Sequence, residues 1–297
     1  MAKKLKVNAS CLEITEVCKT ILSMCTLEAA ERLSIVVLST VGTRKVAEDK
    51  ELWQLLIEAH YGNQRNFFPA APCPKDILPM PYLKPSDMFY PSAACIEFCE
   101  TLVERRMFDR LKVEQGDIQT YSIVDEQPID CIIFPTNSSL INAGTGAAAA
   151  VFRRSGMELD TYVRELHYDG RESNTVVTPG FEAGVDHLIH CVGPSHLRMN
   201  CNPLLYQTYL NAFEQARKLG VKCVAVASIA TGTLGFPLHT AAALAMRAYR
   251  DFIKTHRWTA TVVFVCYDNR IATFIEDAKQ QILDRFNDHC FQVMAVI

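Results

Sequence analysis

Short apolar runs alternate with amphipathic stretches along the second half of the chain. The apolar runs predict strands, and they are 111–115, 131–135, 174–180, 187–193, 223–229 and 260–267. Helical spacing of apolar residues lies between them, over 146–154, 203–219, 238–255 and 270–286. This alternation predicts an α/β fold in which helices cover both faces of a mixed central sheet.

Residues 1–108 have a different hydrophobic pattern and a different composition. Apolar residues at helical spacing predict helices over 14–24, over 49–61 with Gly62 ending the helix, and over 92–111. Seven of the 13 prolines lie within 69–91, a density that excludes a helix or a central strand there. We therefore predict a mostly helical, Pro-rich N-terminal extension, residues 1–108, followed by an α/β domain, residues 109–297.

Charge and cysteine usage narrow the function classes. The net charge of −3 and the lack of a Lys/Arg tract argue against a nucleic-acid partner. The apolar run 33–42 is too short to span a bilayer, and the basic N-terminus lacks the apolar core of a signal peptide. Twelve scattered cysteines, many within apolar runs, are typical of free thiols in a reducing compartment, so we expect an intracellular protein, cytoplasmic or nuclear.

Two loops rich in small residues follow predicted strands. They are FPTNSSLINAGTGAAAA, residues 134–150, and IATGTLGFP, residues 229–237. Ligands of open α/β sheets bind outside the carboxyl ends of the strands, where two such loops can face each other. A Gly-rich turn that opens a helix can point backbone N–H groups at a phosphate, although Gly and Pro also mark ordinary turns.

Five segments, taken in order, resemble the macrodomain family, whose members bind ADP-ribose. They are GDI (116–118), IDCIIFPTNSSL (129–140), AGTGAAAAVFRRSG (143–156), VDHLIHCVGP (185–194) and IATGTLGFP (229–237). The resemblance covers roughly residues 109 to 290. It implies a three-layer α/β/α fold and, as partners, ADP-ribose or ADP-ribosylated proteins.

The resemblance also assigns residues to the adenine base and the distal ribose. Asp117 would accept a hydrogen bond from the exocyclic amine, Ile118 would offer its backbone N–H to the ring, and Tyr267 would lie against the adenine. A turn Asp that pairs with its own backbone is the alternative for Asp117, and core packing is the alternative for Tyr267. Asn137 would contact the distal ribose and carry any catalytic role, unless it only caps the next segment.

The diphosphate would lie between the two loops. The residues that the resemblance assigns to it are Gly144, Thr145, Gly146, Ala147, Thr231, Gly232, Thr233, Leu234, Gly235 and Phe236. In the first of these loops the start of a helix would add a dipole that favours an anion. Two histidines are predicted to have no part in the site. His190, in the middle of a strand, is expected in the core, and His239 is expected on a helix surface.

Three departures from the family bear on catalysis. Ala148 stands where some family hydrolases place an Asp that activates water, Leu234 replaces an aromatic residue, and Phe134 replaces the first Asn of the family's Asn-Ala-Ala-Asn motif. We therefore expect an ADP-ribose reader or a weak hydrolase. The alternatives are a protein mono-ADP-ribosyl hydrolase and a degenerate macrodomain that acts as an interaction module. Residues 138–152 contain neither Cys nor His, so no zinc and no other cofactor is expected.

Overall fold

The computed structural model describes residues 11–39, 44–62, 91–142 and 144–288. The Pro-rich segment predicted over 69–91 lies, apart from Pro91, outside the described residues. The described residues divide into two compact units, one of residues up to 105 together with 284–288 and one of residues 106–283. The predicted start of the α/β domain at residue 109 stays a prediction.

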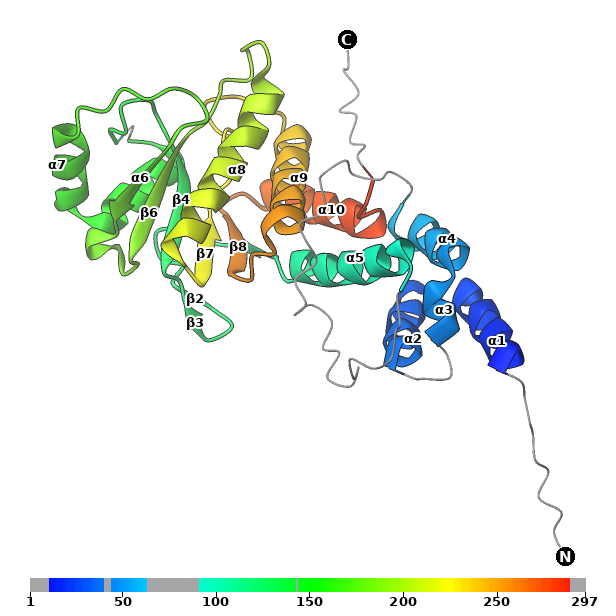
Figure 1. Cartoon of the computed structure of the whole chain (residues 1–297). Coiled ribbons are helices and arrows are strands. Elements are labelled where there is room, and N and C mark those ends of the chain that lie inside the picture. The colour runs from blue at the N-terminus through cyan, green and yellow to red at the C-terminus, as the bar shows by residue number, and fades with distance from the viewer. Residues whose placement is uncertain (1–10, 40–43, 63–90, 143, 289–297) are drawn as a thin grey trace, which may run out of the picture. The chain divides into compact units, whose positions relative to one another are not determined.

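A six-stranded mixed sheet forms the centre of the second unit (Figure 1). Its strand order is β1-β8-β7-β4-β6-β5, and every neighbouring pair is parallel except β5 with β6. The strands are β1 (Lys112–Gln115), β4 (Cys131–Thr136), β5 (Thr175–Pro179), β6 (His187–Val192), β7 (Cys223–Val226) and β8 (Thr261–Cys266). A separate small hairpin, β2 (Ile123–Val124) with β3 (Gln127–Pro128), precedes β4.

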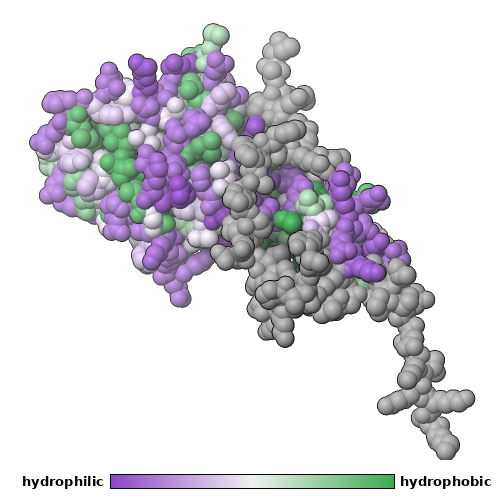
Figure 2. Space-filling view, in the orientation of Figure 1, coloured by the Kyte–Doolittle hydropathy of each residue, from purple (hydrophilic) through white to green (hydrophobic). Residues whose placement is uncertain are grey.

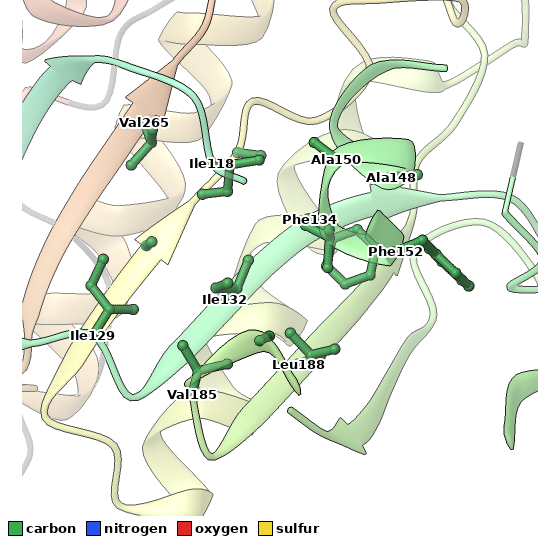
Figure 3. Close-up of a cluster of buried hydrophobic side chains, with 14 of the residues drawn as sticks. Ile118, Ile129, Ile132, Phe134, Ala148, Ala150, Phe152, Val185, Leu188 and Val265 are labelled. Atoms are coloured by element: carbon green, nitrogen blue, oxygen red, sulfur yellow. The ribbon is translucent and has the colours of Figure 1, made fainter. Parts of the chain in front are cut away.

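Helices cover both faces of this sheet. On one face, α6 (Gly146–Ser155) and α7 (Met157–Glu165) pack over the sheet, and a buried cluster includes Ile132 and Phe134 of β4 with Phe152 of α6 (Figure 3). On the other face lie α8 (Cys201–Leu219) and α9 (Leu238–His256), where the rings of Tyr209 and Phe264 are 6.2 Å apart. The last described helix is α10 (Asn269–Asp284). The predicted three-layer α/β/α fold is confirmed.

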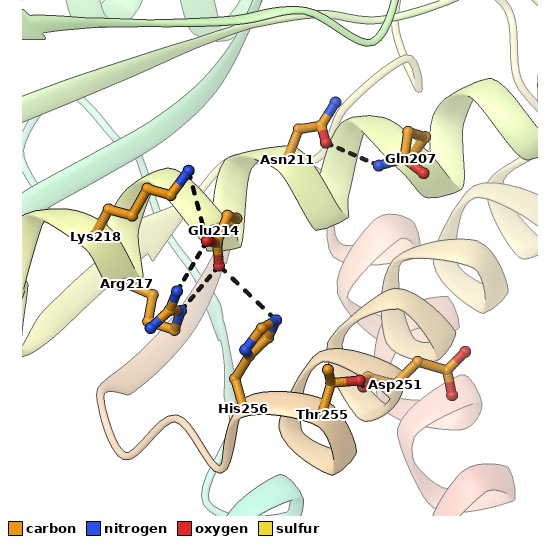
Figure 4. Close-up of polar contacts among 8 residues, drawn as sticks. All are labelled: Gln207, Asn211, Glu214, Arg217, Lys218, Asp251, Thr255 and His256. Atoms are coloured by element: carbon orange, nitrogen blue, oxygen red, sulfur yellow. Dashed lines mark hydrogen bonds and ion pairs between the residues drawn. The ribbon is translucent and has the colours of Figure 1, made fainter. Parts of the chain in front are cut away.

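Polar contacts gather around Glu214 near the end of α8 and reach His256 at the end of α9. Glu214 accepts two hydrogen bonds of 2.8 Å from Arg217, forms an ion pair with Lys218 at 3.6 Å and lies 3.8 Å from Nε2 of His256, whose pKa is lowered by burial (Figure 4). The hydrogen bonds from Arg217 are the main reason that the pKa of the Glu214 carboxyl is lowered. Because the contacts are partly exposed, they add little to the stability of the fold.

The first unit is helical, as predicted. Its helices are α1 (Cys11–Met24), α2 (Leu27–Ser39), α3 (Arg44–Glu48), α4 (Lys50–Tyr61) and most of α5 (Ala93–Asp109). Asp49 caps α4 by accepting a 3.0 Å hydrogen bond from the N–H of Leu52. Buried rings form its core, with the centroids of Trp53 and Tyr61 lying 5.2 and 5.1 Å from that of Phe98.

The surface carries no broad apolar band on the face seen in Figure 2, where hydrophobic residues of the coloured part lie scattered among hydrophilic ones. Among the described residues, no helix combines the length and the hydropathy needed to cross a membrane. Isolated exposed apolar residues such as Leu197 and Met199 are therefore ordinary surface features.

Candidate functional site

The two Gly-rich loops leave the sheet from neighbouring parallel strands. β4 pairs with β7 from Cys131 opposite Val224, so the carboxyl ends of both strands lie at the same edge. From β4 the chain continues to β5 and β6 on one side, and β7 lies on the other side of β4. Such a reversal of strand order is where open α/β sheets bind ligands. We call residues 137–147, after β4, the first loop and residues 227–237, after β7, the second loop.

Asn137 holds the first loop together from inside. Its Oδ1 accepts hydrogen bonds from the N–H of Ile141 and the hydroxyl of Ser139, both at 3.1 Å, and its Nδ2 donates to the carbonyl of Ile141 at 2.8 Å. The side chain therefore acts as the cap that was the alternative to ribose contact. Asn137 is exposed at the end of β4, so one Nδ2 hydrogen remains directed away from these contacts.

The glycines of the first loop leave room for a ligand. Gly144 and Gly146 have φ angles of +74° and +62°, and a Cβ on either residue would meet nothing within 4 Å. Thr145, between them, precedes α6 in an extended conformation and makes no side-chain cap. The first N–H groups of α6 therefore lie at an exposed, uncapped helix start, which suits an anion. Ala147 is half-buried and Ala148 is buried, and neither supplies a polar group.

The second loop is a tight turn whose tip is exposed to solvent. The N–H of Gly235 donates to the carbonyl of Gly232 at 3.0 Å, and Ala230 adopts a positive φ of 66°. Gly232, Thr233 and Gly235 are exposed, whereas Thr231 and Leu234 are half-buried. A Cβ at Gly232 would meet nothing within 4 Å, so space for a ligand remains beside it.

Neighbouring segments hold the second loop through hydrogen bonds and a ring contact. The hydroxyl of Tyr209, on α8, accepts a 2.9 Å hydrogen bond from the N–H of Ile229. The N–H of His196 donates to the carbonyl of Leu234 at 2.9 Å, and the His196 ring lies 5.2 Å from that of Phe236. Phe236 is only 3% exposed, so its side chain anchors the loop rather than facing solvent.

A third element, the turn after β1, lies beside the end of β8. We call residues 116–121 the base turn, and the N–H of Gly116 donates to the carbonyl of Cys266 at 3.0 Å. Asp117 accepts a 2.9 Å hydrogen bond from the N–H of Gln119, which is the turn role that was its alternative. Ile118 is buried, and its N–H finds no acceptor within the described residues.

Tyr267 follows β8 directly and is 82% exposed. Core packing, the alternative for this residue, is therefore wrong. Because β1 and β8 are parallel neighbours that pair Gln115 with Cys266, Asp117 and Tyr267 both leave the same edge of the sheet. The residues predicted to bind the base therefore lie where two neighbouring strands end.

Sequence reasoning missed Arg154 and the supporting role of Tyr209. Arg154 donates to the carbonyls of Ile118, Tyr121 and Ala183 at 2.9, 2.7 and 2.7 Å, which ties the base turn to the short 3₁₀ helix that ends at Ala183. Burial lowers the pKa of the Arg154 guanidinium from its usual value. The available signals in the sequence were an arginine in a short, largely apolar helix and a tyrosine in an apolar stripe, since both need hydrogen-bond partners when they are buried.

His190 is a core residue, as expected. It is fully buried in β6, its Nε2 lies 3.1 Å from the Thr178 hydroxyl, and its ring packs 4.6 Å from that of Phe134. Burial lowers the pKa of the imidazole to about 3, so the ring is neutral at physiological pH and is not poised for acid–base catalysis. His239 lies exposed at the start of α9, as expected.

Within the described ranges, no group of three or more His, Cys, Asp or Glu side chains has the geometry to hold a metal ion. The two loops and the base turn offer backbone N–H groups, side-chain amides and hydroxyls, together with the carboxylate of Asp117.

Comparison with known proteins agrees with this geometry. The family model described as Macro domain matches residues 133–245. An O-acetyl-ADP-ribose deacetylase of Escherichia fergusonii is 34% identical over 167 residues, which span 54% of this chain and 90% of that relative. A Salmonella typhimurium protein of the same name is 31% identical over 174 residues, 56% of this chain and 92% of the relative.

Solved structures share the fold. A macrodomain of Oceanobacillus iheyensis with ADP aligns with a TM-score of 0.54 and 24% identity, over 58% of this chain and 91% of that chain. A Trypanosoma brucei macrodomain in complex with ADP aligns with a TM-score of 0.50 and 19% identity, over 89% of this chain and 95% of that chain. With sequence segments, sheet order and these relatives in agreement, the chain belongs to the macro domain family.

Proposed function

We propose that this protein binds ADP-ribose, free or linked to protein, between the first and second loops. The carrying observation is that two Gly-rich loops leave adjacent parallel strands at a switch point, with open space at Gly144, Gly146 and Gly232. The diphosphate would accept hydrogen bonds from backbone N–H groups of both loops. Asp117, Ile118 and Tyr267 would contact the adenine.

Binding with little turnover fits the groups that this site offers. Ala148 is buried and has no proton acceptor, and the amide of Asn137 is engaged by its own loop. Neither residue can take a proton from water as a carboxylate can. We therefore infer a reader or a weak hydrolase in which Asn137 orients the distal ribose.

A second candidate is removal of an acyl or ADP-ribosyl group, because several relatives carry the name O-acetyl-ADP-ribose deacetylase. Any such reaction here would depend on Asn137 and on water held by the substrate's own phosphates. A degenerate interaction module is the remaining alternative, and it predicts no ligand binding.

Calorimetric titration of ADP-ribose into the full-length protein tests the proposal, with AMP and ADP as controls. Binding that is tighter for ADP-ribose than for ADP supports a site that contacts the distal ribose. No heat and no change in melting temperature would reject it, since a ligand of the native state raises stability. Release of acetate or ADP-ribose, followed on O-acetyl-ADP-ribose and on ADP-ribosylated protein, then separates an enzyme from a reader.

A further inference from the structure

Two backbone carbonyls of the base turn are held by one side chain of α6, that of Arg154. Arg154 donates three hydrogen bonds of 2.7 to 2.9 Å to backbone carbonyls, two in the base turn and one at Ala183. No carboxylate in the described part of the chain forms an ion pair with this guanidinium. Its planar fork can satisfy several carbonyls at once in a fixed geometry, which an ammonium group does less well.

The carbonyl and the N–H of Ile118 belong to successive peptide groups, which the φ and ψ angles of this residue relate. The Ile118 side chain is 5% exposed and packs in the cluster under α6, so the side chain and the carbonyl are both held. Together these contacts restrict the direction of the N–H, which has no acceptor among the described residues. That is what recognition of a ring nitrogen requires.

The second loop is fixed from the opposite face of the sheet. Tyr209, 1% exposed on α8, accepts the hydrogen bond from the N–H of Ile229, which is itself fully buried. The next residue, Ala230, has a positive φ, a conformation that persists only where its surroundings hold it. Without the hydroxyl, the Ile229 N–H would be buried and unpaired.

We propose that Arg154 and Tyr209 are separate positioning residues, Arg154 for recognition of the base and Tyr209 for recognition of the diphosphate and distal ribose. The inference rests on the proposed binding of ADP-ribose. Because the two side chains lie on opposite faces of the sheet and share no partner, their effects on binding should be independent.

The test compares AMP with ADP-ribose, by calorimetry, on full-length Arg154→Lys and Tyr209→Phe proteins. Arg164→Lys is the matched control for the first variant, because Arg164 is exposed on α7 and bonds to Asp160 of the same helix rather than to the base turn. Tyr249→Phe is the control for the second, because Tyr249 is equally buried but packs among Phe108 and Phe213, away from both loops.

Arg154→Lys should weaken AMP and ADP-ribose by the same factor, about tenfold. Tyr209→Phe should weaken ADP-ribose about tenfold and AMP less than about threefold. Both controls should stay within about twofold of wild type. Circular dichroism melting verifies folding, and Arg154→Gln, whose amide can still donate to one carbonyl, replaces Arg154→Lys if that variant is unfolded.

Equal losses for both ligands in both variants, or no losses, would overturn the inference while leaving the proposed function intact. A wild-type protein that binds AMP but gains nothing from the distal ribose would overturn the proposed function instead. The same titrations therefore separate the two failures.

Discussion

The two loops of the site differ in how much they are held by their own side chains. The first loop is held largely by its own amides, since Asn137 bonds to Ile141 and Ser139, and Asn142 accepts a 2.9 Å hydrogen bond from the N–H of Gly144. Its anchors to the domain are the buried Leu140 and a 2.9 Å hydrogen bond from the N–H of Gly170 to the carbonyl of Ser138. The second loop is held mainly by contacts with other segments, through Tyr209, the segment after β6 and the burial of Phe236. The second loop should therefore be the more sensitive of the two to changes elsewhere in the domain.

The largest expected effect comes from Gly232→Glu in the second loop. The new side chain has open space, so the protein should fold, but its carboxylate would lie against the ligand's diphosphate. We expect ADP-ribose affinity to fall by at least about 100-fold, measured by calorimetry.

Gly232→Ala is the control for that variant, because it adds a methyl group in the same open space without charge. Its affinity should stay within about threefold of wild type. If Gly232→Glu binds normally while folded, the assignment of the second loop to the diphosphate is wrong.

Gly193→Ala tests whether the second loop is sensitive to changes outside it. A Cβ at Gly193 would lie 2.9 Å from the Cγ2 of Ile229 and 3.3 Å from the Cδ1 of Leu234, so the loop must shift. Overpacking of this kind costs about 1–3 kcal/mol, and we expect a lower melting temperature together with an affinity about tenfold weaker. Unchanged affinity despite a lower melting temperature would show that the loop is less dependent on its support than the structure indicates.

The elements that could be predicted from the sequence are those whose pattern is local. Long apolar strands and amphipathic helices were found within a few residues, because their periodicity is local. Three helices, α2, α3 and α7, were not predicted, and in α7 only Leu159 and Val163 are buried among nine residues. The hairpin of β2 and β3 was missed because two-residue strands have no period to detect.

The glycines of the site were visible in the sequence, but its supports were not. Arg154 and Ile118 are 36 residues apart, and Tyr209 and Ile229 are 20 apart, so these hydrogen bonds exist only once the sheet has assembled. The same holds for Phe236, whose place in a motif predicted a ligand contact and whose ring is buried against His196. A motif identifies a loop, whereas tertiary contacts decide which of its side chains face outward.

Asn137→Ala tests the hydrogen bonds that the first loop makes within itself. It removes three hydrogen bonds within the first loop, each with a net worth of about 0.5–1.5 kcal/mol, partly offset by water at this exposed position. ADP-ribose affinity should fall about fivefold, and any release of acetate or ADP-ribose should fall further. Asn137→Asp keeps the acceptor for Ile141 and should retain more of the loop's order, as measured by amide exchange; equal loss in both variants would argue against the capping role.

The smallest effect is expected for Asn142→Ala, which removes one support of the first loop. The Asn142 side chain accepts the N–H of Gly144 and so helps to hold that residue at its positive φ before the start of α6. Glycine reaches this conformation without a side-chain penalty, so the loop should lose order without changing its path. We expect an affinity about threefold weaker and an unchanged melting temperature. Asn142→Ser can restore a hydroxyl acceptor and should recover part of the affinity. A large fall in melting temperature would mean that the Asn142 contact also holds the first loop against the body of the domain, and the comparison between the loops would fail.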